Sequence, residues 1–154
     1  MKVLGFRGDP KAPRYAVVSE ESGVFTLENA ASDNKLLVPA SILEEADAER
    51  LDWVYREILA IFDANSGIAK VIIKQNEFTR LDTKAKRRSA YIDAAVILAC
   101  AHRNIPVELK IYGAMGTTSA DTKQHGESRV GKTTKYWDAK MADAVNAAWW
   151  GIRH

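Results

Sequence analysis

Cysteine is almost absent from this sequence: Cys100 is the only one, so no disulfide can form within the chain. It lies in the apolar run AAVILACA, where we expect a buried, unreactive thiol. Long apolar runs are also missing, since none approaches the roughly 18 residues that a membrane-spanning helix needs. The opening residues MKVLGFRGDP lack the apolar core of a signal peptide. We therefore expect a cytoplasmic protein and exclude a disulfide-bonded secreted protein and a membrane protein.

Histidine is scarce too, and its pattern predicts no metal site or nucleophilic enzyme. His102 and His125 are far apart, and neither has a thiol or carboxylate at the spacing of metal ligands. No serine–histidine–aspartate or cysteine–histidine arrangement is present. The 22 lysines and arginines exceed the 20 aspartates and glutamates by two, which is too small an excess to indicate a partner. The length of 154 residues predicts one domain spanning residues 1–154.

The first part of the chain predicts an antiparallel sheet. Three short segments rich in valine, phenylalanine, tyrosine and leucine are separated by the turn sequences GDPKAP and EESG: residues 2–7, 14–19 and 23–28. The gaps between them are too short for a crossover helix. Consecutive strands joined in this way pair antiparallel.

Helices and strands alternate in the remainder. Apolar residues recur every three or four positions over residues 48–64, which predicts a helix. Strands are expected at residues 69–74 and 105–112. Between them a helix begins with Ser89 as its cap and runs to Arg103. A last helix follows Asp138 and ends at Trp150, with Gly151 past its end. The order predicts an α/β fold with a mixed five-stranded sheet, three strands antiparallel and two parallel, covered by helices.

The segment GESRVGKT, residues 126–133, matches the phosphate-binding loop pattern G-x-x-x-x-G-K-[ST] at every position. A working loop of this kind needs a buried strand before it and a helix that starts at its Lys-Thr. The preceding residues TTSADTKQH cannot form a buried strand, and the next predicted helix starts near Asp138. We therefore interpret the segment as a flexible basic loop that matches by chance, and expect no nucleotide to bind there.

The order of elements and three short motifs resemble the RuvC-type Holliday-junction resolvases, which have a ribonuclease H fold. Those proteins open with a strand similar to L-G-I-D-P-G, and this chain opens with LGFRGDP. Their fourth strand ends in a glutamate, where this chain has VIIKQ. Their last helix carries D-x-x-D-A, and here the helix contains KMADA. The resemblance covers nearly the whole chain.

The resemblance implies that four carboxylates would bind two Mg²⁺ ions for hydrolysis of a phosphodiester. The corresponding positions in this chain are Arg7, Lys74, Lys140 and Asp143, so only Asp143 keeps the acid. Mg²⁺ requires hard anionic oxygen ligands, and we expect no divalent cation at this degenerate site. Basic replacements instead suggest internal ion pairs, with Lys140 and Asp143 one helical turn apart, or direct contact with a phosphate.

A shifted alignment leaves an alternative open. If short insertions change the register, the four acids Asp9, Glu77, Asp138 and Asp143 would form an intact Mg²⁺ or Mn²⁺ site. The chain would then be an active metal-dependent endonuclease. Against this, Gly8-Asp9-Pro10 predicts a turn, and Asp138 and Asp143 lie about 140° apart around a helix.

Two basic clusters could contact the phosphates of nucleic acid. The first is RLDTKAKRR, with Arg80, Lys84, Lys86, Arg87 and Arg88, and the second is Arg129, Lys132 and Lys135. Both are expected in loops on the side of the sheet where the parallel strands end. Tyr136 and Trp137 could stack on bases. Alternatively, both clusters are charged surface exposed to solvent and have no binding role.

The sequence thus predicts a RuvC-like protein that binds nucleic acid, with branched DNA as a candidate, and does not cleave it. The apolar second helix is a candidate interface, and the resemblance implies a homodimer. A scaffold subunit that acts through a partner protein and does not bind nucleic acid is a further alternative.

Overall fold

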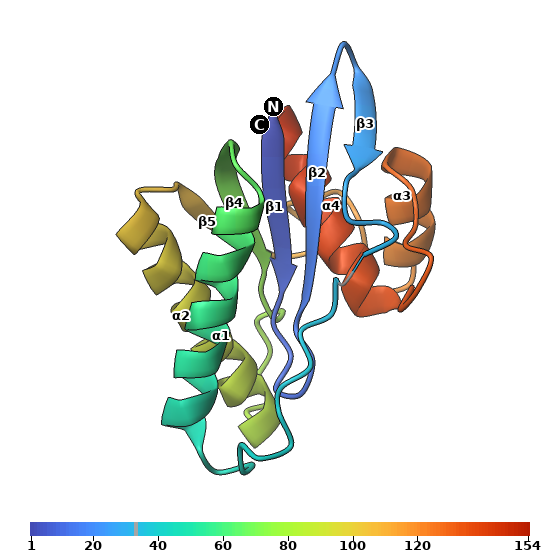
Figure 1. Ribbon diagram of the computed structural model, residues 1–154. Coiled ribbons are helices and arrows are strands. Elements are labelled where there is room, and N and C mark those ends of the chain that lie inside the picture. Colours follow the sequence, from blue (N-terminus) through green and yellow to red (C-terminus); the bar gives the residue numbers. More distant parts are fainter. Residues whose placement is uncertain (33) are drawn as a thin grey trace.

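The computed structural model describes residues 1–32 and 34–154 (Figure 1). Three strands come first: β1 (Lys2–Arg7), β2 (Arg14–Glu21) and β3 (Val24–Leu27). Helices and strands then alternate: α1 (Asp47–Ala64), β4 (Ile68–Lys74), α2 (Lys84–Arg103) and β5 (Val107–Lys110). Two helices complete the chain: α3 (Thr122–Arg129) and α4 (Ala139–Arg153).

The strands of the described residues form one mixed sheet in the order β3-β2-β1-β4-β5. β1, β2 and β3 pair antiparallel, whereas β4 is parallel to β1 and β5 is parallel to β4. This confirms the predicted mixed sheet of five strands. Because β1 and β4 run in the same direction, they end at the same edge, where Arg7 and Lys74 are register partners.

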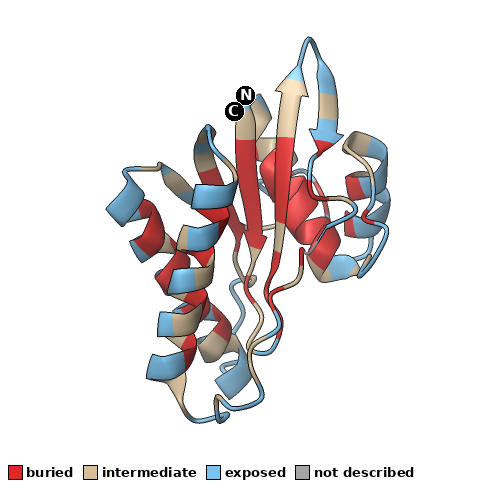
Figure 2. Cartoon of the chain, viewed as in Figure 1, coloured by how far each residue is buried: buried red, intermediate tan, exposed pale blue. Residues whose placement is uncertain are grey.

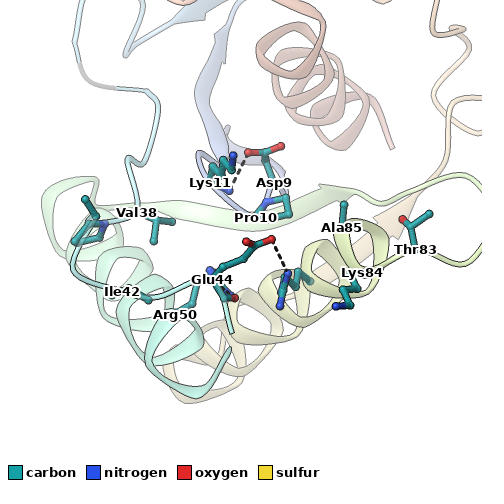
Figure 3. A pocket seen from close by; sticks show the side chains of 13 residues that line it. Asp9, Pro10, Lys11, Val38, Ile42, Glu44, Arg50, Thr83, Lys84 and Ala85 are labelled. Carbon is teal, nitrogen blue, oxygen red and sulfur yellow. Dashed lines mark hydrogen bonds and ion pairs between the residues drawn. The ribbon is translucent and has the colours of Figure 1, made fainter. Parts of the chain in front are cut away.

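Loops and helix termini gather at this carboxyl edge of the sheet. The β1–β2 loop, the segment that precedes α1 and the first turn of α2 enclose a pocket of about 740 Å³ (Figure 3). Ligand sites of α/β proteins lie outside the carboxyl ends of the strands. The functional residues of the chain are therefore sought first at this edge.

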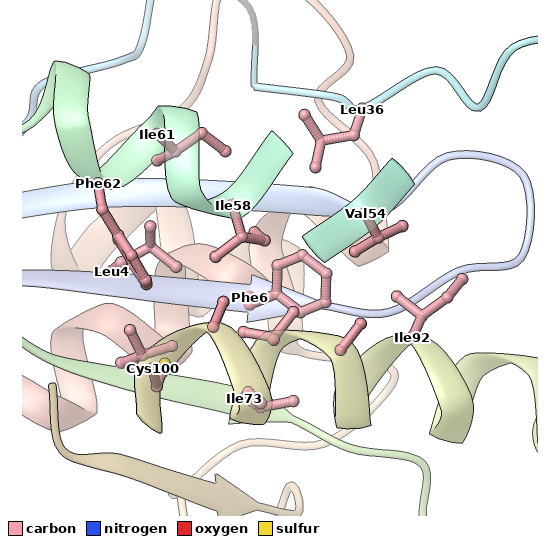
Figure 4. Packing of buried hydrophobic residues seen from close by; sticks show 14 of the residues in the cluster. Leu4, Phe6, Leu36, Val54, Ile58, Ile61, Phe62, Ile73, Ile92 and Cys100 are labelled. Atoms are coloured by element: carbon pink, nitrogen blue, oxygen red, sulfur yellow. The ribbon is translucent and has the colours of Figure 1, made fainter. Parts of the chain in front are cut away.

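The central strands are largely buried (Figure 2), and apolar side chains pack on both faces of the sheet. Leu4, Phe6 and Ile73 point to one face, where they pack against α1 and α2 together with the fully buried Cys100 (Figure 4). Val3 and Ile72 point to the other face and pack against α4. This alternation follows from the period of two in a strand. Among the residues that the structure describes, no helix combines the length and apolar character needed to cross a bilayer.

Helix α4 lies unusually close to β1 because small residues face each other there. A Cβ atom added at Gly5 would lie 1.9 Å from the carbonyl oxygen of Ala144. Gly5 thus lets the helix backbone approach the strand. This approach places Asp143, next to Ala144, beside the end of β1.

Three expectations from the sequence were wrong. Helix α2 begins at Lys84, with Thr83 as its cap, and not after Ser89. Helix α3 occupies part of the expected flexible loop, because it packs against α4 and buries Thr122 and Gly126. Helix α4 continues to Arg153, so Gly151 lies within it. There the missing side chain leaves room for the sheet, since a Cβ at Gly151 would lie 2.5 Å from Ile72.

Candidate functional site

The strands β1 and β4 end in two adjacent cations on the α4 side of the carboxyl edge. The side chain of Arg7 is 13% exposed and that of Lys74 only 1%. Isolated buried charges are costly, so each requires a partner of opposite charge or an acceptor. Both cations have such partners.

Asp143 of α4 is the main partner of Arg7. The Nε atom of Arg7 lies 3.1 Å from one carboxylate oxygen of Asp143, which also accepts a hydrogen bond of 3.1 Å from the hydroxyl of Tyr112. The other oxygen accepts a hydrogen bond of 2.8 Å from the hydroxyl of Thr122. Burial raises the pKa of Asp143, although these hydrogen bonds and the charge of Arg7 oppose the rise. Both oxygens are occupied by donors of the protein.

Lys74 is enclosed by neighbouring groups. Its ammonium lies 2.5 Å from the carbonyl oxygen of Gln75, 3.7 Å from the carboxylate of Glu77 and 3.9 Å from the ring centroid of Tyr112. Burial, reinforced by the charge of Arg7, lowers the pKa of Lys74. The cation–π contact and the carboxylate of Glu77 stabilise the charged form.

A buried acid that the sequence analysis missed lies beside these cations. Asp93 of α2 is 4% exposed, and its Oδ1 atom has no hydrogen-bond partner among the described residues. Burial raises the pKa of Asp93 to about 7, and the charges of Arg7 and Lys74 oppose the rise. The spacing in the sequence could have identified this residue. Asp93 follows Ser89 by four residues and precedes Val96 by three, so it lies on the buried face of the helix.

The expected ion pair between Lys140 and Asp143 is absent, and this expectation was wrong. Lys140 instead pairs with Asp9 of the β1–β2 loop. Asp9 also accepts backbone hydrogen bonds from Lys11 and Ala12, at 3.1 and 2.8 Å, which form a turn. Arg7, Lys74 and Asp143 therefore form one cluster, and Lys140 belongs to a separate pair nearer the surface.

Each acid of the alternative metal site has a partner within the protein. Asp9 pairs with Lys140, and Glu77 accepts a hydrogen bond of 3.0 Å from the backbone of Tyr112. Asp138 accepts from the backbone of Met141 as the cap of α4 and pairs with Arg14 at 2.7 Å. Within residues 1–32 and 34–154, no group of three or more acids, histidines or cysteines is arranged to hold a metal ion.

The first basic cluster was expected in a loop, but all of it except Arg80 belongs to α2. Arg80 and Lys84 are exposed, and no acid contacts them among the described residues. Arg87 lies beside Asp82 at the surface, with a shortest distance of 2.5 Å, and Lys86 contacts Thr79. The side chain of Arg88 is only 13% exposed because it pairs with Glu44 at 3.2 Å and Asp47 at 3.3 Å. Arg88 is thus a structural residue.

The second basic cluster is divided by the fold. Arg129 ends α3, donates to Asn146 at 3.0 Å and to Gly116 at 2.7 Å, and lies 4.1 Å from the ring centroid of Trp149. Asn146 and Trp149 belong to the part of α4 that leads away from the carboxyl edge. Because Arg129 is the last residue of α3, the expectation that it lies in a loop was wrong. Lys132 pairs with Glu127 at the surface, and Lys135 is exposed.

The segment GESRVGKT has the order helix, then loop. Its first four residues end α3, and no helix begins at Lys132 or Thr133. This order differs from the strand, loop and helix of a phosphate-binding loop. Trp137, one of the two expected stacking rings, packs against Gly126 of the same segment, whereas Tyr136 is 45% exposed.

Comparisons with known proteins show similarity at the level of structure. The sequence matches no model of a known protein family and no curated protein. The RuvC protein of Thermus thermophilus in complex with a Holliday junction substrate superposes with a TM-score of 0.76 and 16% identity. The superposition covers 99% of this chain and 93% of that protein.

Two further Holliday junction resolvases are similar. The fowlpox virus enzyme, solved with its substrate DNA, has a TM-score of 0.56 and 14% identity over 99% of this chain and 95% of its own. The yeast mitochondrial enzyme has a TM-score of 0.53 and 14% identity over 98% and 77%. The chain therefore has the ribonuclease H-like fold in the form found in the RuvC-type Holliday junction resolvases.

Proposed function

We propose that the chain binds nucleic acid, with branched DNA as the first candidate, and does not cleave it through bound metal ions. One observation carries the proposal: where the resemblance to RuvC-type resolvases implies metal-binding carboxylates, this chain has the buried pair of Arg7 and Asp143 beside Lys74. Two cations repel a divalent ion at this position. The acid that remains has both oxygens occupied by hydrogen bonds.

The proposed contact surface is the loop between β4 and α2 with the first turn of α2, which we call the basic edge. Arg80 and Lys84 are exposed there without an acidic partner among the described residues. Phe78 in the same loop is 79% exposed. Such exposure of a large ring is costly in water, whereas a base can stack on it. Cations beside an exposed ring are the combination that single-stranded and branched nucleic acids require.

The cluster of Arg7 and Lys74 supports this surface and does not contact phosphate itself in the proposal. The donors of Arg7 are directed at Asp143, at the side chain of Asn76 and at the carbonyl oxygen of Lys74. Lys74 is almost completely buried. A phosphate would have to displace these partners. The exposed cations of the basic edge can bind it without rearrangement of the core.

The test is fluorescence anisotropy of a labelled four-way DNA junction, titrated with the protein in EDTA and again in Mn²⁺, each at two salt concentrations. We expect binding that is independent of the metal and weakens with salt, because phosphate contacts release counterions. The same samples are run on a denaturing gel. Cleavage in Mn²⁺ that is lost on Asp9→Asn or Asp143→Asn would overturn the proposal in favour of an active nuclease.

Single substitutions test whether the basic edge is the surface that contacts nucleic acid. Arg80→Ala and Lys84→Ala should each weaken binding and reduce the slope of log affinity against log salt by about 1, as expected for one phosphate contact. Lys123→Ala is the matched control, because Lys123 is an exposed lysine on α3, outside the basic edge. Absence of salt-dependent binding to the junction would favour the scaffold alternative.

We further propose a homodimer through α2. Tyr91 and Leu98 are 41% and 52% exposed, and Ala94 lies exposed between them at helical spacing. Ala94 and Leu98 leave this stripe open to solvent, while Tyr91 also interacts with Arg87, and a second copy could bury the stripe. Leu98→Glu should convert a dimer to a monomer in light scattering, whereas Leu37→Glu, at an exposed leucine outside α2, should not. A wild-type monomer at high concentration would refute this.

A further inference from the structure

The pocket at the carboxyl edge lies on the α1 and α2 side of the sheet, apart from the cluster of Arg7 and Lys74. Pro10 and Lys11 of the β1–β2 loop lie on one side of it, and Lys84 and Ala85 of α2 lie on another (Figure 3). Its volume of about 740 Å³ is in the range of sites that hold small organic ligands.

The pocket carries positive charge that the protein does not neutralise. Two of its four cationic residues, Arg50 and Arg88, are paired with Asp47 and Glu44. The other two, Lys11 and Lys84, are exposed, and no acid pairs with their ammonium groups among the residues that the structure describes. The acid Asp9 in the wall is paired with Lys140. Two positive charges thus remain for a ligand.

The start of α2 adds donors to these charges. Thr83 caps the helix by accepting from the backbone N–H of Lys86 at 3.2 Å. Within residues 1–32 and 34–154, no acceptor contacts the backbone N–H groups of Lys84 and Ala85, and both residues line the pocket. The first turn of α2 contains no acid, contrary to the usual preference of a helix dipole. Of the four basic residues at this end, Arg87 and Arg88 are paired with acids, whereas Lys84 and Lys86 form no ion pair among the described residues.

The wall shows a similar shortage of acceptors. Arg50 is 4% exposed and donates to Asp47 at 3.0 Å and to the carbonyl oxygens of Leu43 and Glu44 at 3.0 and 2.8 Å. Its Nε atom is buried and has no acceptor among the described residues. The remaining wall is mainly aliphatic, with Pro10, Val38, Pro39 and Ile42. The pocket therefore combines an apolar wall with the ammonium groups of Lys11 and Lys84 and the free N–H groups at the start of α2.

We propose that this pocket binds a nucleoside carrying a phosphate monoester, with the phosphate at Lys11, Lys84 and the start of α2 and the base against the aliphatic wall. A phosphate monoester carries about −1.5 to −2 at neutral pH, which matches two lysines and a helix terminus better than the single charge of a phosphodiester. The ligand is a 5′-phosphorylated strand end or a free nucleoside monophosphate. The former source rests on the proposed binding of nucleic acid.

The experiment compares a labelled 12-nucleotide single strand with a 5′-phosphate and the same strand with a 5′-hydroxyl, by anisotropy at low salt. We expect the phosphorylated strand to bind at least about fivefold more tightly. Calorimetric titrations with deoxyadenosine monophosphate, deoxyadenosine and inorganic phosphate distinguish the sources. Binding of the monophosphate without a preference for the phosphorylated strand would identify the free nucleotide as the ligand.

For each pocket variant we compare the affinity for the 5′-phosphorylated strand with that for the 5′-hydroxyl strand. A general loss of nucleic-acid affinity does not change this ratio. Lys84→Ala should reduce the preference. Ala85→Phe, which fills the pocket from an exposed helix position, should abolish it without lowering the melting temperature. Lys123→Ala should leave the ratio unchanged.

Equal affinity for both strands together with no binding of the monophosphate overturns this inference. Inorganic phosphate that binds as tightly as the monophosphate would overturn the part that concerns the nucleoside. Neither result affects metal-independent binding of the four-way junction, so the proposed function would stand. If the wild-type protein does not bind the junction but does bind the monophosphate, the proposed function is refuted and the free nucleotide remains as the ligand of the pocket.

Discussion

The substitution Asp143→Asn distinguishes a rebuilt, internally paired cluster from a metal site. In a metal-binding group of acids, loss of one carboxylate relieves repulsion and stabilises the metal-free protein. Here Asp143 is the anion that neutralises Arg7, and its side chain is 2% exposed. Asparagine keeps the shape, but its NH2 group cannot accept the hydrogen bonds that one carboxylate oxygen now receives, and Arg7 and Lys74 are left side by side with less negative charge. We therefore expect the opposite effect, a loss of stability.

The magnitude follows from burial. Removal of one partner from a buried ion pair costs about 3–5 kcal/mol, because the other charge is left unpaired. Arg7 is 13% exposed, so water can partly solvate the unpaired guanidinium, and the lower end of the range is expected. For a chain of 154 residues, a loss of about 3 kcal/mol lowers Tm by about 6–12 °C.

The assay is urea unfolding of the wild type and the variant in EDTA, followed by circular dichroism. Asp82→Asn is the matched control, because Asp82 pairs with Arg87 at the exposed surface and should be nearly neutral. An Arg7→Met, Asp143→Asn double variant should lose less than the sum of the single variants. A variant Asp143→Asn as stable as the wild type, or more stable, would refute the reasoning.

Three further predictions concern single positions. Burial raises the pKa of Asp93 to about 7, so between about pH 4 and pH 7 the folded chain keeps a proton that the unfolded chain releases. The free energy of unfolding therefore falls as the pH rises from about 4 to 7. Asp93→Asn should therefore gain stability relative to the wild type between pH 5 and pH 8, by about 3 kcal/mol in urea unfolding, and a constant difference would contradict the argument. Gly5→Ala should destabilise the fold by about 1–3 kcal/mol, because its Cβ meets the backbone of Ala144, whereas Gly113→Ala has open space and should cost much less in the same melting experiment. Phe78→Ala should weaken binding of the junction by about 5- to 150-fold without changing Tm, and an unchanged affinity would remove this ring from the proposed surface.

The errors of the sequence analysis have physical causes. The segment KAKRR places cations at the positive end of a helix dipole, so local preference favours a later helix start at Ser89. The structure begins α2 at Lys84 because Thr83 caps it and because Glu44 and Asp47, distant in sequence, neutralise Arg88. Similarly, the sequence TKQHGESR has little intrinsic tendency to form a helix, and packing against α4 provides the stabilisation of α3.

The pairing of charges could not be obtained from spacing alone. Lys140 and Asp143 have the spacing of a helical ion pair, but they point to different neighbours. Asp143 faces Arg7 at the end of β1, whereas Lys140 reaches Asp9 in the loop beyond it. Asp93 was missed because it lies in another helix, and only the folded chain brings it to the cations.

The sequence by itself determined the mixed sheet, the order of the strands and of every helix except α3, and the presence of Arg7 and Lys74 at the ends of two strands, because these depend on local periodicity and on residue identity. Only the tertiary structure decided which charges meet and which remain free. Its close packing of α4 on Gly5 pairs Arg7 with Asp143, while the capped start of α2 leaves Lys84 without an acidic neighbour among the described residues. Contacts between residues far apart in the chain depend on distances that no local pattern contains.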